Sequence, residues 1–167
     1  MKLPSAVVRP AASSDVDIVV EMIRALAGYE RLSEECAVQA AALREHLFGP
    51  KPLAEVLIAE IDGTAAGFAL FFPTYSTFLT KPGLWLEDLF VNPEHRRRGV
   101  GGALLTRVAQ LAADRGCGRL EWSVLGWNRS AIDFYQRLGA RLMHEWTICR
   151  VEGKDLAAFD HRFVVPR

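Results

Sequence analysis

The most informative segment of the chain reads Leu89-Phe90-Val91-Asn92-Pro93-Glu94-His95-Arg96-Arg97-Arg98-Gly99-Val100-Gly101-Gly102-Ala103-Leu104-Leu105. A strand-like apolar run leads through a basic, glycine-rich turn directly into an amphipathic helix. Glycine tolerates positive φ and lets other groups approach the backbone closely. A helix N-terminus presents unpaired N–H groups and a partial positive charge. Together these features predict a binding site for a diphosphate.

Two familiar phosphate-binding motifs do not fit this turn. No Lys-Ser or Lys-Thr pair follows the glycines, so the segment is not a P-loop. The dinucleotide-binding motif Gly-x-Gly-x-x-Gly requires a third glycine, but Leu104 occupies that position. The segment also lies in the middle of the chain rather than in a first βαβ unit, so this motif does not fit either. A glycine-rich helix start with basic side chains and no ligand stays the structural alternative.

The segments before this turn predict strands and helices in alternation. Ser14-x-x-Asp17 indicates a helix start, with the hydroxyl as cap. Asp62-Gly63 between two apolar runs indicates a tight hairpin. The expected elements are a strand at 6–9, helices at 14–30 and 38–48, hairpin strands at 54–60 and 65–73, and a strand at 83–91 that is buried on both faces.

The segments after the turn continue the pattern. They predict a helix at 100–115, a strand at 119–125, a helix at 130–138 that stops at Gly139, a strand at 140–151, a short helix at 154–159 and a last strand at 162–165. The order predicts an α/β fold in which helices cover both faces of a mixed sheet. The length of 167 residues predicts one domain, residues 1–167.

Composition excludes several classes of protein. Twenty basic and twenty acidic residues leave no net charge, so we expect neither nucleic acid nor an anionic membrane as a partner. The first residues lack the apolar run of a signal peptide and no apolar run is long enough to span a membrane, so we expect neither feature. The histidines form no pair with metal-binding spacing. Three widely spaced cysteines (Cys36, Cys117 and Cys149) predict reduced thiols and a cytoplasmic location.

The turn resembles the acetyl-CoA motif of the GNAT superfamily of N-acetyltransferases, in which Arg or Gln is followed by Gly-x-Gly or Gly-x-Ala. Here the motif is Arg96-x-x-Gly99-x-Gly101. A second family block is similar to Trp127-Asn128-Arg129-Ser130-Ala131, followed by Phe134-Tyr135 and Leu138-Gly139-Ala140. The resemblance implies a twisted, mostly antiparallel mixed sheet of six or seven strands flanked by about four helices.

Further matches extend over nearly the whole chain. Leu26-Ala27-x-Tyr29-Glu30 and Leu86-Glu87-Asp88-x-x-Val91 resemble the diamine (spermidine/spermine) and thialysine acetyltransferases within this superfamily. Tyr75-Ser76-Thr77-Phe78 is closer to the thialysine type, because polyamine-type members carry an acid where Ser76 stands. The resemblance implies acetyl-CoA as cosubstrate, a small amine as acceptor, no metal and a homodimer.

The reaction needs a neutral amine as nucleophile. Deprotonating a lysine-like amine with a pKa of ~10.4 costs roughly 4.6 kcal/mol at pH 7, and a nearby carboxylate lowers that barrier. Glu87 is the expected proton acceptor. Adjacent strand residues point to opposite faces, so we expect at most one of Glu87 and Asp88 to face the site, and Asp88 could pair with a structural arginine.

The resemblance assigns the remaining roles. Tyr135 would donate a proton to the CoA thiolate, although plain packing is its structural alternative. Backbone N–H groups at 89–91 would stabilise the oxyanion. The expected cofactor-binding residues are Leu89, Phe90, Val91, Arg96, Arg97, Arg98, Gly99, Val100, Gly101, Gly102, Asn128, Ser130, Ala131 and Tyr135. The expected substrate-binding residues are Tyr29, Glu30, Glu87, Glu121, Trp122 and Glu145, with Glu30 and Glu121 alternatively plain surface acids.

The leading hypothesis is direct acetyl transfer to a small cationic amine in a ternary complex. The acceptor could alternatively be an amine of a protein, a peptide or an antibiotic. A CoA-binding sensor without catalysis is a different class, which the presence of Tyr135 and Glu87 disfavours. A nucleotide-binding regulatory domain is disfavoured by the missing phosphate-loop lysine.

Overall fold

A computed structural model describes residues 6–158. The chain forms two compact units that divide between Ser123 and Val124. Among the described residues of the first unit, one sheet holds the strands in the order β1-β2-β3-β4-β5. The strands are β1 (Val7–Pro10), β2 (Glu55–Ile61), β3 (Thr64–Ser76), β4 (Lys81–Val91) and β5 (Leu120–Glu121). Pairing is antiparallel from β1 to β4 and parallel between β4 and β5. The predicted mixed, mostly antiparallel sheet is confirmed.

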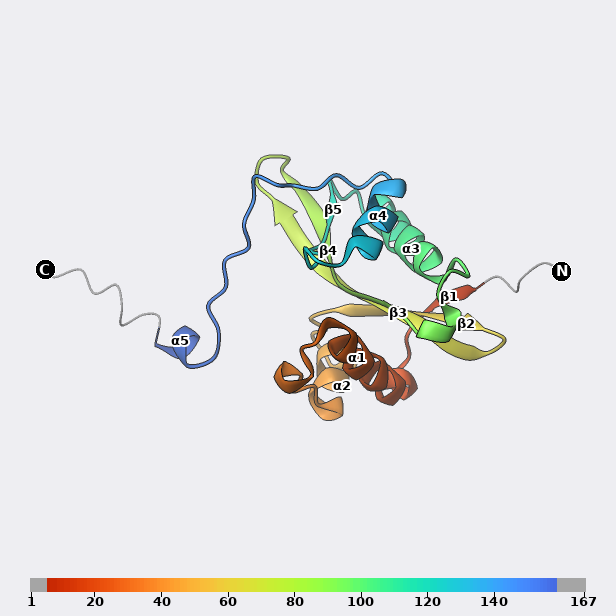
Figure 1. Cartoon of the computed structure of the whole chain (residues 1–167). Helices are drawn as coiled ribbons and strands as arrows, with labels where there is room; N and C mark the ends of the chain where they lie inside the picture. Colours follow the sequence, from red (N-terminus) through yellow and green to blue (C-terminus); the bar gives the residue numbers. More distant parts are fainter. Residues whose placement is uncertain (1–5, 159–167) are drawn as a thin grey trace, which may run out of the picture. The chain divides into compact units, whose positions relative to one another are not determined.

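Helices cover both faces of this sheet. Helices α1 (Val16–Glu30) and α2 (Ala40–Phe48) lie on one face, and α3 (Val100–Asp114) lies on the other (Figure 1). On the α1 face a core of buried side chains joins the two helices to the strands: Val19, Met22, Leu47, Val56, Ile58, Phe68 and Phe90. Strand residues of the opposite parity, such as Leu57, Ala69 and Phe71, are buried toward α3. The α/β class therefore follows from the spacing of apolar residues, which repeats every two residues in the strands and about every 3.6 residues in the helices.

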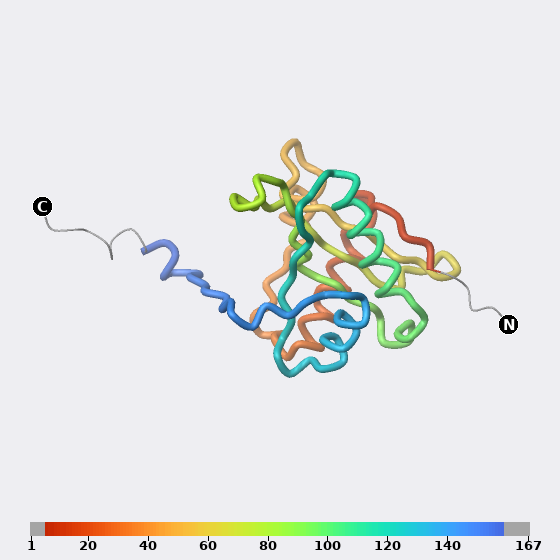
Figure 2. The backbone as a smooth tube through the Cα atoms, turned by 90° about the horizontal axis from the view of Figure 1, so that it is seen from above, coloured from red at the N-terminus to blue at the C-terminus, as the bar shows by residue number. Residues whose placement is uncertain are grey.

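Two hairpins connect the antiparallel strands. Asp62 and Gly63 both have positive φ, and Ile61 pairs with Thr64, which is the two-residue turn that the sequence predicts. The longer hairpin between β3 and β4 ends in a tip, drawn in yellow-green, that projects from the body of the first unit (Figure 2). Phe78 at this tip is 97% exposed. Ser76 is buried and its hydroxyl accepts a hydrogen bond from the Leu79 amide, so it shapes the tip.

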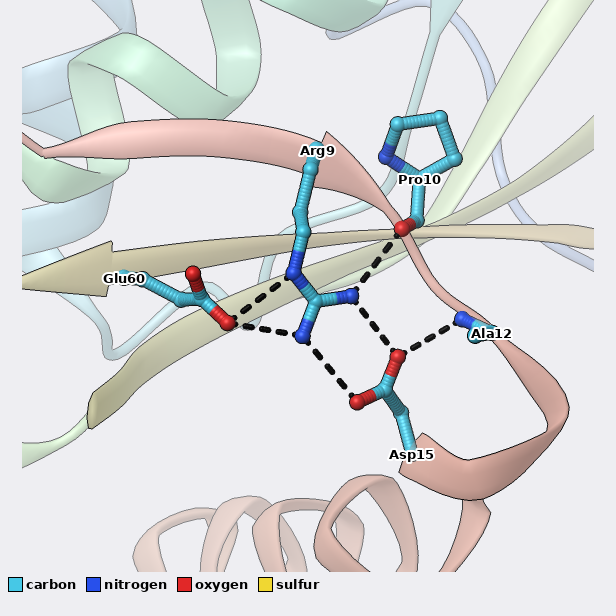
Figure 3. Close-up of polar contacts among 5 residues, drawn as sticks. All are labelled: Arg9, Pro10, Ala12, Asp15 and Glu60. Atoms are coloured by element: carbon cyan, nitrogen blue, oxygen red, sulfur yellow. Dashed lines mark hydrogen bonds and ion pairs between the residues drawn. The ribbon is translucent and has the colours of Figure 1, made fainter. Parts of the chain in front are cut away.

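An arginine clamp fixes the start of α1 to the sheet (Figure 3). The Arg9 guanidinium donates to Glu60 on β2 and makes two bonds to Asp15, of 2.7 and 3.1 Å. The Asp15 carboxylate also accepts from the Ala12 amide. The predicted Ser14 cap is wrong, because a short 3₁₀ turn at Ser13–Asp15 precedes α1 and Asp15 binds the backbone N–H instead.

The second unit holds α4 (Arg129–Arg137) and α5 (Gly153–Ala157). The predicted strand at 140–151 is wrong, since no described strand pairs with this segment and an unpaired segment cannot form a ladder. The strand predicted at 119–125 shrinks to Leu120–Glu121, because only Leu84 and Trp85 of β4 pair with it. The sheet accordingly has five strands among residues 6–158 rather than six or seven. The strand predicted at 162–165 lies outside the described residues.

Candidate functional site

The predicted phosphate turn connects the end of β4 to α3. Asn92 anchors its start to β3, because its backbone N–H donates to Ala66 and its side chain donates to Ala65. Arg97 has φ 60° and Gly99 has φ 82°, so both lie in the left-handed region. Gly99 is the N-cap of α3, and this φ favours glycine there. We call residues 96–102 the glycine turn.

Backbone N–H groups of the glycine turn after Arg96 are available to a ligand, while that of Arg96 itself donates to the Pro93 carbonyl. Those of residues 97–102 make no backbone hydrogen bond of normal geometry within residues 6–158. A Cβ added at Gly102 would meet nothing within 4 Å. Packing therefore does not explain this glycine, although glycine in a helix costs about 1 kcal/mol relative to alanine. An open surface beside unpaired amides is the geometry that an anion needs.

Two arginines of the turn, Arg96 and Arg98, have different surroundings. The Nε of Arg96 donates to the Val91 carbonyl, and its guanidinium lies 4.8 Å from the centroid of the Tyr29 ring. Arg96 therefore ties the turn to the end of α1. The Nε of Arg98 is buried without a hydrogen-bond partner among residues 6–158, while its Nη1 lies 3.2 Å from His95 Nδ1. Arg98 thus retains a buried donor for an acceptor that the described chain does not supply.

A β-bulge lies at Glu87 in β4. Asp88 pairs with Leu70 and Leu86 pairs with Phe71, so Glu87 has no partner residue on β3. Trp85 donates from Nε1 to the Glu87 carboxylate at 2.8 Å, which places Glu87 on the side of the sheet that Trp85 occupies. On β3, Phe72 pairs with Trp85 and Leu70 pairs with Asp88. Phe72 and Leu70 are two residues apart, so they point to the same side of the sheet, and Asp88 therefore lies on the same side as Trp85. The expectation that at most one acid faces this side is therefore wrong, because the bulge interrupts the alternation.

The acids at the bulge lie close to the end of α1. Burial is the largest cause that raises the pKa of Asp88 from 3.8 to about 6, and repulsion from Glu87 and Glu30 adds to it. Burial also raises the pKa of Glu30. No arginine forms an ion pair with Asp88 within residues 6–158, so the predicted structural arginine is absent there. Glu87 and Glu30 therefore both repel the ionised Asp88 carboxylate where α1 ends beside β4.

Strand β4 also keeps an open edge in the first unit. Its pairing with β5 covers only Leu84 and Trp85, so no strand among residues 6–123 pairs with this edge from Leu86 to Val91. Glu121 lies opposite Trp85 in the parallel pair and forms an ion pair of 2.6 Å with Arg119. The surface-acid alternative for Glu121 is strengthened by this pairing. Trp122, the next residue, is half-buried.

The other predicted residues belong to the second unit. The Asn128 side chain caps α4 by accepting from the Ala131 amide at 3.2 Å, and Ser130 lies in the first helical turn. Tyr135 is 8% exposed, and its ring lies 5.3 Å from that of Phe134. Glu145 is exposed, in the segment that follows α4. It stays a prediction that Tyr135 and Glu145 lie close to Glu87 and Asp88 of the first unit.

Comparison with known proteins identifies this arrangement. The family model of the acetyltransferase (GNAT) family matches residues 20–140, which include the glycine turn, the β4 bulge and α4. The chain belongs to the GNAT family. It is therefore an acyltransferase, and the predicted family membership is confirmed.

Relatives of the GNAT chain with curated names act on amines. A thialysine N-ε-acetyltransferase from Sus scrofa is 37% identical over 163 residues, covering 91% of this chain and 95% of the relative. An L-ornithine N5-acetyltransferase from Arabidopsis thaliana is 48% identical over 99 residues, 59% of this chain and 43% of the relative. Among solved structures, an integron cassette protein from V. cholerae has a TM-score of 0.77 at 25% identity, covering 93% of this chain and 98% of that one.

One feature of this GNAT site, the acid at Asp88, is not predicted by the sequence. The sequence predicts at most a structural ion pair for Asp88, but Asp88 follows the bulge residue Glu87 and has the most strongly raised pKa among the described acids. No local signal identifies the bulge, because the bulge is set by the register between β3 and β4. Two absences hold for residues 6–158: no group of three or more metal-ligating side chains, and no helix that is both long and apolar enough to cross a membrane.

Proposed function

We propose that this GNAT protein transfers the acetyl group of acetyl-CoA to the primary amine of a small cationic substrate. The substrate class is a lysine-like amine such as thialysine, or a diamine or polyamine. The observation that carries the proposal is that a pair of acids at the β4 bulge and a turn with unpaired amides lie on one continuous strand-turn-helix segment. The names of the thialysine and ornithine acetyltransferases support the choice of an amine.

The glycine turn fits the diphosphate of coenzyme A. Unpaired amides at 97–102, the open space at Gly102 and the unpartnered Nε of Arg98 all offer donors or room to an anion. The open edge of β4 at residues 89–91 could pair with the pantetheine arm, and its amides could bind an oxyanion. When bound, acetyl-CoA supplies the acetyl group as a thioester.

The bulge acids would hold the amine and take its proton. Carboxylates at Glu30, Glu87 and Asp88 attract a cation, although the chain as a whole has no net charge. Glu87 is held by Trp85 and is exposed, so it can accept a proton directly or through water. Asp88, with a pKa near 6, would be ionised at neutral pH and can share this role. Tyr135 would return a proton to the departing thiolate.

The test is thiol release from acetyl-CoA with a panel of amines. The panel holds thialysine, lysine, ornithine, putrescine, spermidine, an aminoglycoside and a lysine-containing peptide. We expect turnover with at least one small amine, and initial-rate lines that intersect as a ternary complex requires. Turnover only with the aminoglycoside or the peptide would favour the alternative acceptors. Tight CoA binding without turnover by any amine would favour the sensor.

A homodimer and a cytoplasmic location stay part of the proposal. Apolar side chains that a partner could cover are exposed in the second unit: Met143, Trp146, Ile148, Val151 and Leu156. Light scattering coupled to size exclusion would give twice the chain mass of 18.6 kDa for a dimer. A single-chain mass would contradict this part of the proposal.

A further inference from the structure

The first unit contains a cavity that the proposed acetyl transfer does not use. Its volume is about 570 Å³, within the range of small-molecule sites. It lies between the end of α2, the start of β2 and the C-terminal half of α3, whereas the glycine turn lies at the N-terminal end of α3. Apolar side chains that line the cavity include Leu47, Phe48, Leu53, Leu57, Phe71 and Leu111.

Only three of the lining residues carry a charge, and their charges sum to one positive charge. They are Glu55, Arg107 and Arg115. Arg115 donates two hydrogen bonds to the Glu55 carboxylate, of 2.6 and 2.7 Å, so these two neutralise each other. The side chain of Arg107 makes no hydrogen bond or ion pair within residues 6–158. One positive charge on the wall is left without a counter-charge.

The position of Arg107 on α3 directs this charge to the cavity. Arg107, Leu111 and Arg115 recur every four residues, so they form one face of the helix. Arg107 is half-buried, and Phe71 beneath the cavity is fully buried. A guanidinium beside apolar side chains binds a planar anion such as a carboxylate most favourably, because it can donate two hydrogen bonds to it.

We propose that this cavity binds a small amphipathic carboxylate, an apolar chain or ring that ends in one anionic group. The carboxylate binds Arg107, and the apolar part lies among Phe48, Leu53 and Leu111. The cavity's net positive charge disfavours the cationic amines that the acidic bulge would attract. The inference does not depend on the acetyltransferase activity and would hold for a chain that turns over no amine.

The test uses the full chain, octanoate as ligand, and octan-1-ol and octylamine as matched controls. Calorimetric titration should give one saturable site for octanoate, with a Kd about tenfold or more below that of octan-1-ol, as a charge-assisted bond implies. Arg107→Gln should weaken octanoate about tenfold and leave octan-1-ol unchanged. Arg24→Gln, which removes an exposed arginine on α1, should change neither affinity.

Leucine methyl spectra locate the site. We expect octanoate to shift the methyl signals of Leu47, Leu53, Leu57 and Leu111 and to leave in place those of Leu26 and Leu70, which pack against the core on the α1 face of the sheet. The proposal is overturned if octanoate does not saturate, if octan-1-ol or octylamine binds as tightly, or if the shifted methyl groups lie elsewhere. Should Arg107→Gln fail to fold, the comparison of octanoate with octan-1-ol in the natural chain still decides.

Discussion

The ionised carboxylate of Asp88 destabilises the folded chain at neutral pH. Its pKa is about 6 in the folded chain against an ordinary 3.8, so the unfolded chain ionises first as the pH rises. Native stability therefore falls between about pH 4 and pH 6 and stays lower above that window. Such a cost is expected where a charged group serves a site rather than the fold.

Asp88→Asn should therefore be more stable than the natural chain at pH 7, by about 1–2 kcal/mol, while acetyl transfer falls at least tenfold. The gain should vanish below about pH 4, where Asp88 is protonated in both states. Urea unfolding at pH 7 and pH 3.5 measures the difference. Glu94→Gln, at an exposed acid, is the matched control. Equal stabilities of Asp88→Asn and the natural chain at pH 7 would contradict the account.

Tyr135 is buried, and removing its hydroxyl leaves the ring in place. If Tyr135 donates the proton to the thiolate, Tyr135→Phe should lower kcat by about 10²-fold or more while the Kd for CoA changes little. Steady-state kinetics and calorimetry give the two quantities. An unchanged kcat would remove Tyr135 from the proposed mechanism and return it to a packing role.

The glycine turn places unpaired backbone N–H groups at the start of α3. Gly102→Leu adds a side chain where the chain has open space, so folding should be unharmed or improved by up to about 1 kcal/mol. The same side chain would obstruct a diphosphate, and we expect the Kd for CoA to rise at least tenfold. Ala109→Leu, on the exposed side of the same helix, should leave CoA binding unchanged. Equal CoA affinities of the two variants would argue against the turn as the binding site.

The arginine clamp holds β1, β2 and the start of α1 together. Hydrogen bonds from Arg9 lower the pKa of Asp15, so the stabilisation from Asp15 is full above its ordinary pKa of 3.8 and is lost as the pH falls through the lower folded value. Arg9→Gln should cost about 1–2 kcal/mol at pH 7, because the clamp is partly exposed. Thermal or urea unfolding measures this loss, with Arg24→Gln as control. A stability equal to that of the control would show that the clamp is dispensable.

Local signals in the sequence predicted the elements that depend on near neighbours. Asp62-Gly63 specified its turn because both residues accept positive φ, and the glycine turn was found because Gly99 must take a left-handed φ before α3. The β4 bulge could not be predicted, since it appears only when Leu70 and Phe71 are placed opposite β4. The segment 140–151 has strand-like composition, but strand formation requires a partner that the sequence pattern does not reveal.

On the scale of the whole molecule, charged and polar groups of different sign lie in three separate places. The glycine turn carries unpaired amides and Arg98, the β4 bulge carries carboxylates, and the cavity beside the C-terminal half of α3 carries Arg107 without a counter-charge. A net charge of zero conceals this separation, because opposite charges are sorted locally rather than removed. Ligands of opposite sign are therefore expected at the glycine turn and at the bulge.

The most direct measurement is a titration of the ¹⁵N-labelled chain with coenzyme A and, in parallel, with pantetheine, which lacks the diphosphate. We predict that coenzyme A shifts the amide signals of residues 97–102 strongly, and that pantetheine leaves them unchanged while shifting signals along residues 86–91 of β4. If coenzyme A binds and the signals of residues 97–102 do not move, the glycine turn does not hold the diphosphate, and the assignment of the whole site is contradicted.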